Sequence, residues 1–443
     1  MTKYNWQSNI TQETLENNSI LYKIEDNSIP VIYFKLIMED GALTEDKSEL
    51  GITSLLSQML LNGNKNFPQS KVNLELDKLG ASLNIASGYD YFALISRIPS
   101  DNFIKFIDFL NILLFSAMDF DMEKFEISKS KAKSLLLRIK EHDSYLSSMI
   151  FSNVIFKNKN YGLLSSGNSN SLDKLKIENL NNRLEYLKKS KHFWLIGGDY
   201  TQNDILKLKE FTNKFKNTNK QSESAPEMHT PNGFELYYHH KEDKNKVNII
   251  TGAPSISLKN NDISYMLVFN KYFGSDFTSV MAQEIREKNG WSYYASSEFS
   301  LYKYATLFNM EYAPNIENLL PSFKYFKKLF FDNINNKINN EHLEFTKKKI
   351  INSYNFKFST TVKKLSLLSD LKLYNYPKNF FEKYKSDVVN VNSDILEQKI
   401  KNIINPENQI VVMVGDIKSK LKELENSNMF SKITELTTLD FLS

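Results

Sequence analysis

The stretch Gly51-Ile-Thr-Ser-Leu-Leu-Ser-Gln-Met-Leu-Leu-Asn-Gly63 decides how the rest of the chain is interpreted. It predicts a helix that ends at a glycine. Ser54, Ser57 and Gln58 are spaced i, i+3 and i+4, so their side chains share one face of that helix. Imidazole and carboxylate groups bind zinc well, whereas serine hydroxyls and a carboxamide are neutral, weak ligands. This face therefore offers little to a zinc ion.

The composition predicts a globular protein of several domains. The chain has 443 residues, of which 41% are hydrophobic and 24% charged, enough for about two to four domains with real cores. The formal net charge of +4 is mild and no block of like charge occurs, so we expect no nucleic-acid partner. The absence of cysteine excludes disulfides, thiolate metal sites and cysteine nucleophiles.

Neither end of the chain nor its interior carries a membrane or export signal that we recognise. No apolar run approaches the roughly 20 residues that span a bilayer, and Met1–Ser8 has no signal-peptide core. We expect a soluble protein without a membrane span. It would be periplasmic if a leader has been removed and cytoplasmic otherwise.

Three features of the first half recur in the second half at a nearly constant offset, which predicts two duplicated domains. The paired segments are Leu195–Tyr200 with Met413–Ile417, Met122–Glu126 with Asn340–Glu344, and Arg97–Ser100 with Tyr312–Asn315. Between the halves lies a polar stretch with two prolines and no apolar periodicity. We therefore predict a first domain over residues 1–216, a linker over 217–232 and a second domain over 233–443.

Strand and helix patterns are mixed within each half without strict alternation. This favours an α+β fold in which each domain has a mainly antiparallel sheet packed with helices on one face. The predicted elements include a strand over Ile29–Met38, a helix over Ser70–Leu79 that ends at Gly80, long helices over 102–117 and 121–140, a second-half strand near Lys246–Gly252, and helices over Ile263–Phe273 and Asp276–Lys288.

These segments together resemble the pitrilysin/insulinase family of zinc peptidases, which includes the mitochondrial processing peptidase, over nearly the full chain. The resemblance rests on the duplication, on the Gly-Asp strand end in each half, and on three segments: Gly51–Gly63, Leu76–Asn84 and Gln283–Ala295. The first of these is the helix frame, and the last is similar to the family's L-R-E-x-x-G-L-A-Y motif. The resemblance implies a bacterial member of the family, whose two domains form half of a clam-shell.

The family's zinc residues do not carry over to this sequence. In the inverzincin motif H-x-x-E-H, the first His falls on Ser54, the Glu base on Ser57 and the second His on Gln58. The third ligand, a Glu, would fall near Ser134–Leu137, where there is no carboxylate. With three ligands and the base absent, the resemblance implies a non-catalytic chain without metal, and zinc on a partner chain.

The histidines offer no replacement metal site. None of them forms His-x-x-x-His, and His239 and His240 are adjacent on a predicted strand, so they point to opposite faces. We expect scattered histidines rather than metal ligands.

One pair of family residues is retained, Arg286 and Tyr293. The resemblance implies a division of labour in two-chain members of the family. There, the non-catalytic chain presents an Arg and a Tyr, seven positions apart, to the partner's active site. Arg286 would end the helix and Tyr293 would begin the next strand, where both could bind substrate. The alternative is a surface salt bridge from Arg286 to Glu284 or Glu287, with Tyr293 half-buried in the sheet.

Two functions follow from this interpretation. The first is a non-catalytic, substrate-binding subunit of a heterodimeric zinc metallopeptidase that acts on peptides or small unfolded proteins, paired with a catalytic sibling. The second is a structural or peptide-binding protein of the same fold that has no role in proteolysis, as a homodimer or in a larger assembly. An active enzyme with an unrecognised site is a third, weaker option.

Overall fold

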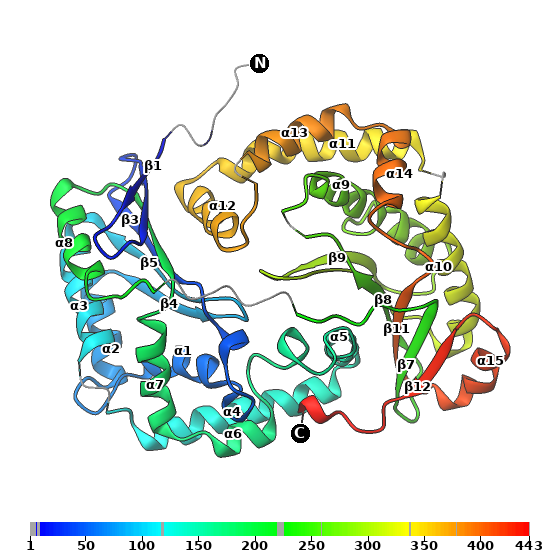
Figure 1. The fold of residues 1–443 in the computed structure, drawn as a ribbon, viewed down its shortest axis with the longest axis horizontal. Coiled ribbons are helices and arrows are strands. Elements are labelled where there is room, and N and C mark those ends of the chain that lie inside the picture. Colours follow the sequence, from blue (N-terminus) through cyan, green and yellow to red (C-terminus); the bar gives the residue numbers. More distant parts are fainter. Residues whose placement is uncertain are drawn as a thin grey trace.

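The computed structural model describes residue 6 and residues 9–116, 119–218, 226–257, 259–335, 338–377 and 379–442. Two six-stranded sheets stand on either side of the molecule, each flanked by helices (Figure 1). Strands of the first sheet lie between residues 10 and 198, and those of the second between 234 and 435. Part of the predicted linker, residues 219–225, lies outside the described residues.

The first sheet has the order β1-β2-β6-β3-β5-β4, with β2 and β6 parallel and every other neighbouring pair antiparallel. Its strands are β1 (Ile10–Thr14), β2 (Ile20–Glu25), β3 (Val31–Met38), β4 (Ser82–Ser87), β5 (Phe92–Pro99) and β6 (His192–Gly198). The predicted strand over Ile29–Met38 is β3. Alternation of apolar side chains along it places Ile32, Phe34 and Leu36 in one core.

The second sheet repeats this arrangement. Its order is β12-β7-β11-β8-β10-β9, in which β7, β11, β8, β10 and β9 occupy the places of β2, β6, β3, β5 and β4. The strands are β7 (Phe234–His240), β8 (Asn248–Pro254), β9 (Ala295–Leu301), β10 (Thr306–Tyr312), β11 (Gln409–Gly415) and β12 (Lys432–Glu435). Only β7 with β11 and β7 with β12 pair in parallel. The α+β class with mainly antiparallel sheets is thus confirmed.

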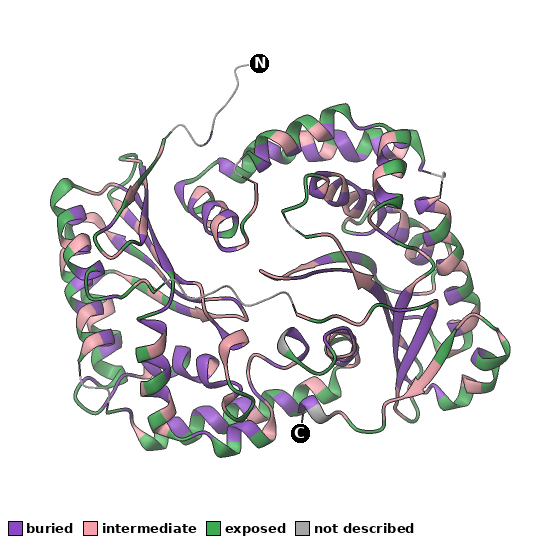
Figure 2. Cartoon of the chain, in the orientation of Figure 1, coloured by how far each residue is buried: buried purple, intermediate pink, exposed green. Residues whose placement is uncertain are grey.

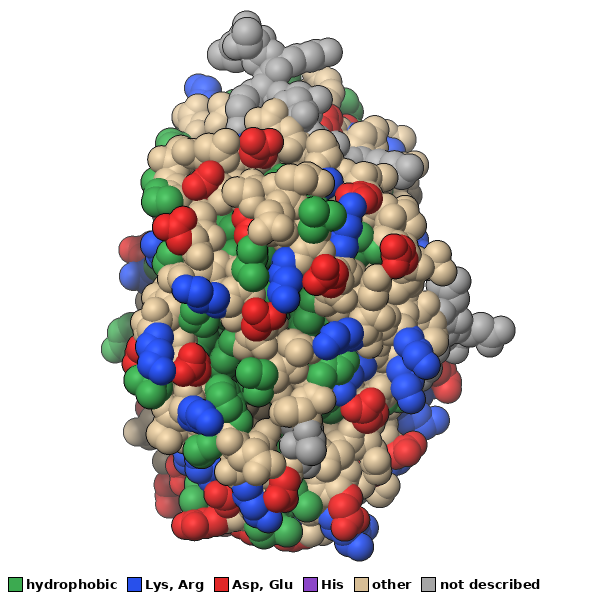
Figure 3. Space-filling view, turned by 90° about the vertical axis from the view of Figure 1, so that its left-hand side faces the viewer, with side chains coloured by type: hydrophobic (Ala, Val, Ile, Leu, Met, Phe, Trp, Pro, Cys, Tyr) green, Lys and Arg blue, Asp and Glu red, His purple; other side chains and the backbone are tan. Residues whose placement is uncertain are grey.

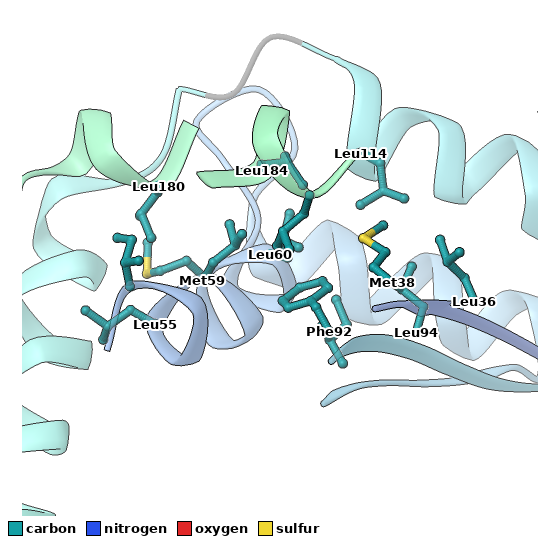
Figure 4. Packing of buried hydrophobic residues seen from close by; sticks show 14 of the residues in the cluster. Leu36, Met38, Leu55, Met59, Leu60, Phe92, Leu94, Leu114, Leu180 and Leu184 are labelled. Atoms are coloured by element: carbon teal, nitrogen blue, oxygen red, sulfur yellow. The ribbon is translucent and has the colours of Figure 1, made fainter. Parts of the chain in front are cut away.

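The helices of the first domain pack mainly on one face of its sheet. They are α1 (Ile52–Asn62), α2 (Gln69–Leu79), α3 (Phe103–Phe115), α4 (Met122–Glu141), α6 (Ser169–Lys174), α7 (Ile177–Leu187) and α8 (Gln202–Thr212). Figure 4 shows Met59 and Leu60 of α1 on the side of Leu180 and Leu184 of α7. Each buried side chain of this size contributes about 1.5–3 kcal/mol by leaving water, so this face fixes the position of α1.

The helices of the second domain repeat this packing. They are α9 (Ile263–Phe273), α10 (Leu319–Ile334), α11 (Asn340–Tyr354), α13 (Phe380–Asn390), α14 (Ser393–Lys401) and α15 (Leu421–Asn426). One predicted helix is wrong in its extent. The segment Asp276–Ser279 forms turns, and the helix that follows becomes a π-helix over Ala282–Lys288. The Asp276 carboxylate accepts from the Thr278 backbone N–H and from two lysines, which holds it in a turn instead of a helical start.

The two domains exchange a helix, so the prediction that helices cover only one sheet face is also wrong. Helix α5 (Asp143–Ile155), from the first half, packs on β8 and β11 of the second sheet. Helix α12 (Thr361–Leu373), from the second half, packs on β3 and β6 of the first sheet (Figure 1). Leu195 of β6 shares an apolar cluster with Leu365 of α12, and Val412 of β11 shares one with Ile150 of α5, so these helices remove apolar side chains of both sheets from water. The central strands of both sheets are accordingly coloured as buried in Figure 2.

A buried polar cluster also joins the domains. The turn between β9 and β10 reaches the first domain, where the Lys303 backbone N–H donates to Asp90 Oδ2 at 3.0 Å. The Tyr161 hydroxyl donates to Asp90 Oδ1 at 2.6 Å, and Lys303 Nζ lies 2.8 Å from Glu39 Oε2. Burial raises the pKa of Asp90, against the effect of its hydrogen bonds to Tyr161 and Lys303. The cluster therefore couples the two halves through groups that would be costly to separate.

On the outer side of the first domain, acidic and basic side chains are interspersed (Figure 3). This face carries no large area of one charge.

Candidate functional site

Helix α1 begins after Gly51, where the backbone is closely packed against the Ser166 carbonyl group. Gly51 has φ of +93°, and a Cβ there would lie 2.5 Å from the Ser166 carbonyl oxygen, so glycine is required by both conformation and space. The Glu45 carboxylate accepts hydrogen bonds from the backbone N–H of Gly51 at 2.7 Å and of Thr53 at 2.8 Å. Burial raises the pKa of Glu45, although these hydrogen bonds oppose the shift. The start of α1 is thus capped from within the protein.

Arg183 of α7 also holds the start of α1. Its Nε donates to Thr53 Oγ1 at 2.9 Å, and its Nη2 donates to the Gly41 carbonyl oxygen at 2.6 Å and to Thr44 Oγ1 at 3.0 Å. The side chain is buried, which lowers its pKa, while the charge of Glu45 opposes that effect. Neither Glu45 nor Arg183 is among the site residues predicted from the sequence. The scarcity of arginine, which occurs only four times in the chain, is the signal that could have pointed to Arg183.

The three degenerate zinc positions all lie on α1 but differ in exposure. Ser54 is half-buried, Ser57 is buried and Gln58 is exposed. The Ser57 hydroxyl donates to the Ser54 carbonyl oxygen at 2.7 Å, within the helix. Neither serine offers a negative charge or a strong donor atom to a cation.

The segment expected to carry the third ligand lies on α4, which packs beside α1. Leu136 is buried, and Leu135 and Leu137 are exposed, the latter by 62%. Over the described part of the chain, no group of three or more His, Asp or Glu side chains is placed to hold a metal ion. The side chains at these positions therefore do not fit the zinc ion that the resemblance implies for the fold.

Arg286 lies on the π-helix Ala282–Lys288 of the second domain, with its side chain 39% exposed. Its Nε is 3.3 Å from Glu287 Oε1, and its guanidinium carbon is 5.6 Å from the ring centroid of Phe277. The contact with Glu287 is one of the two predicted alternatives. Glu284 instead contacts Lys288 at 3.0 Å and accepts from the Tyr325 hydroxyl. Short π-helical segments are rare and are frequently found at functional sites.

Tyr293 is 82% exposed, and Lys246 Nζ lies 4.2 Å from its ring centroid. It precedes β9, which begins at Ala295, so the prediction that Tyr293 begins a strand is wrong. The neighbouring Tyr294 hydroxyl donates to Glu311 and lies 2.9 Å from Asn248 Oδ1. An exposed side chain in a loop is free to meet another molecule, which a tyrosine half-buried in the sheet would not be.

The structure places these residues in two separate sets. Ser54, Ser57 and Gln58 belong to the first domain, and Arg286 and Tyr293 belong to the second.

His239 and His240 both lie on β7. His239 Nδ1 lies 2.8 Å from the Leu436 carbonyl oxygen and His240 Nδ1 3.6 Å from Asp416, so they engage separate groups.

Two domain models of one protein family match the sequence. Residues 23–164 match "Insulinase (Peptidase family M16)" and residues 180–350 match "Peptidase M16 inactive domain". The non-peptidase homolog YmxG of Helicobacter pylori is 22% identical over 366 residues, which cover 82% of this chain and 83% of that protein. These matches confirm the resemblance drawn from the motifs.

Solved structures show the same fold. The peptidase M16 inactive domain from Pseudomonas fluorescens superposes with a TM-score of 0.83 at 16% identity, covering 92% of this chain and 98% of that one. A chain of Complex III2 from Candida albicans superposes with a TM-score of 0.71 at 12% identity, covering 95% and 99%. Among the described residues, no helix combines the length and apolarity needed to cross a membrane. Because both matching models belong to this family and together span most of the sequence, the chain belongs to the M16 (insulinase) peptidase family and has two M16-type domains.

Proposed function

We propose that this chain is the substrate-binding subunit of a heterodimeric zinc metallopeptidase that acts on peptides or small unfolded proteins. The partner is a catalytic sibling of the same family that carries an intact His-x-x-Glu-His and holds the zinc. This chain supplies half of the clam-shell wall and presents Arg286 and Tyr293 to the substrate.

The observation that carries the proposal is the exposure of Arg286 on a π-helix and of Tyr293, seven positions later, in the loop that follows. Tyr293 is 82% exposed, and Arg286 contacts its neighbour Glu287 and the Phe277 ring. A guanidinium donates a planar fork of hydrogen bonds to a carbonyl or carboxylate. A phenol hydroxyl donates to a peptide carbonyl or to a developing oxyanion. Neither task needs a metal on this chain.

The test is peptide cleavage by the assembled pair. The chain is co-purified with a sibling that carries His-x-x-Glu-His, and Arg286→Ala is compared with the unsubstituted pair. We expect kcat/KM to fall by about 30- to 1000-fold, which corresponds to about 2–4 kcal/mol of transition-state stabilisation.

Lys288→Ala is the matched control, since Lys288 lies on the same π-helix, carries the same charge and pairs with Glu284. Size-exclusion chromatography confirms that each variant still assembles. Unchanged turnover by the assembled Arg286→Ala pair, or an equal loss in Lys288→Ala, would contradict the proposed role.

The second candidate is a structural or peptide-binding protein with no role in proteolysis. The ion pair between Arg286 and Glu287 favours it, because a guanidinium held by its neighbour needs no substrate. This candidate predicts a stable homodimer or a larger assembly, and a gene without an adjacent catalytic sibling. Formation of an active pair with such a sibling would exclude it.

A further inference from the structure

A pocket lies between α10 and the segment 428–431. This segment joins α15 to β12, and Figure 1 shows α10 and α15 at the outer, right-hand side of the second domain. Its volume of about 650 Å³ is in the range of small-molecule sites. Its wall combines apolar side chains with three lysines, and Glu407, Asn428 and Ser431 also line it. The lining includes Phe234, Lys324, Lys327, Phe331, Met429 and Phe430.

The basic side chains come from one face of α10. Lys324, Lys327 and Lys328 are spaced i, i+3 and i+4, and Phe331 follows one turn later on the same face. Lys328 forms an ion pair with Asp332. Among the described residues that line the pocket, Glu407 is the one carboxylate. The pocket therefore has an excess of positive charge beside an apolar wall.

Lys327 is the most informative of these side chains. It is half-buried, and its Nζ lies 4.1 Å from the Phe234 ring centroid and donates to the Met429 carbonyl oxygen at 3.3 Å. Over the described residues, no carboxylate lies within ion-pairing distance of it. Burial lowers the pKa of Lys327, and the charge of Glu407 only partly opposes this. An anion placed here would form a charge-assisted hydrogen bond in a site partly shielded from water.

We propose that this pocket binds a small amphiphilic anion, an anionic head group on an apolar tail. The head group contacts the ammonium groups of Lys327 and Lys324. The tail lies against Phe331, Met429 and Phe430, of which Phe331 is 42% exposed in the structure. Covering these side chains provides the apolar part of the binding free energy.

Isothermal titration calorimetry of the isolated chain tests this proposal with three probes that share one tail: decanoate, decyl phosphate and decyltrimethylammonium. We expect one saturable site for an anionic probe and none for the cation. The tighter of the two anions identifies the head group as carboxylate or phosphate. Saturable binding of the cation with equal affinity, or no saturable binding of either anion, would overturn the proposal.

Substitutions locate the site. Lys327→Met keeps the apolar stem and removes the charge, and we expect about a tenfold or greater loss of affinity for the anion. Lys324→Met, at an exposed position that leaves the core intact, should weaken binding in the same direction. Lys348→Met on α11, exposed and outside the pocket, is the control. Wild-type affinity in both Lys327→Met and Lys324→Met would place the anion elsewhere and refute the assignment.

Discussion

The Ser57 hydroxyl donates a hydrogen bond to the backbone carbonyl oxygen of Ser54, at 2.7 Å, within helix α1. The two positions to which the predicted motif alignment assigns a metal ligand and a general base are thus hydrogen-bonded to one another within their own helix. Gln58, the third position, is exposed. Hydrogen bonds with Glu45 and Arg183 hold the start of this helix, so its position does not depend on a bound metal ion.

Restoring the motif on α1 should restore only part of a zinc site. The variant Ser54→His, Ser57→Glu, Gln58→His places two imidazoles at i and i+4, which bind zinc weakly without a third ligand. We expect weak, reversible zinc binding by calorimetry and no peptidase activity in the isolated chain. Hydrolysis of a peptide by this triple variant would show that another side chain completes the site.

Arg183 should be among the most costly residues to remove. Arg183→Ala leaves Thr53, the Gly41 carbonyl oxygen and the buried Glu45 without their cationic neighbour, which we expect to lower the free energy of unfolding by about 3–5 kcal/mol. Urea denaturation followed by circular dichroism measures it. Arg138→Ala, at an exposed position, is the control, with an expected change within about 0.5 kcal/mol. A loss below about 1 kcal/mol for Arg183→Ala would contradict this account of how α1 is held.

Much of each domain could be predicted from sequence because its signals are local. Gly80 has φ of +59° and ends α2, and Asp121 caps α4 by accepting from the backbone N–H of Glu123, as their residue types indicate. The exchange of α5 and α12 could not be predicted, because an apolar helix face does not indicate which sheet it covers. The turn at Asp276 was missed for a related reason, since its partners Lys271 and Lys349 come from two other helices.

Asp276 should make stability depend on pH in the acid range. Burial opposes its ionisation, but hydrogen bonds from Lys271, Lys349 and the Thr278 backbone N–H outweigh this and hold its pKa well below the ordinary range. Because the folded pKa is below the unfolded value of about 3.9, this stabilisation is present above about pH 5 and is lost as the pH falls toward the folded pKa.

The measurement is the free energy of unfolding of Asp276→Asn and wild type at pH 7 and pH 3. We expect a deficit of about 1–2 kcal/mol at pH 7 that shrinks at pH 3. Asp262→Asn, which removes a more exposed ion pair with Lys399, should cost less than about 1 kcal/mol. An Asp276→Asn deficit that grows on acidification would show that the sign is wrong.

Asp90 should couple the two domains. Asp90→Ala leaves the Tyr161 hydroxyl and the Lys303 backbone N–H unpaired in a buried place, at a cost of about 2–4 kcal/mol. We expect faster amide hydrogen exchange at the β9–β10 turn, while exchange in α1 is unchanged. Asp90→Asn, which keeps one acceptor oxygen, should have a smaller effect. Equal exchange at this turn in all three proteins would mean that the cluster does not join the domains.

The residues of the candidate site could be predicted from the sequence, but their structural surroundings could not. Ser54, Ser57 and Gln58 could be assigned to α1 from spacing, and Arg286 and Tyr293 from the family motif. The π-helix under Arg286 and the loop position of Tyr293 depend on tertiary contacts, such as the Tyr325 hydroxyl on Glu284. The pocket beside Lys327 combines α10 with a segment about a hundred positions later, which no local pattern indicates.

The most direct test of the central claim is the zinc content of the chain purified alone without chelator, measured by mass spectrometry of the metal and by titration with Zn²⁺. We expect far less than one zinc per chain and no tight binding, because α1 offers hydroxyl and carboxamide groups where the family's ligands would stand. One tightly bound zinc per chain that disappears in the double variant Ser54→Ala, Gln58→Ala would contradict the account.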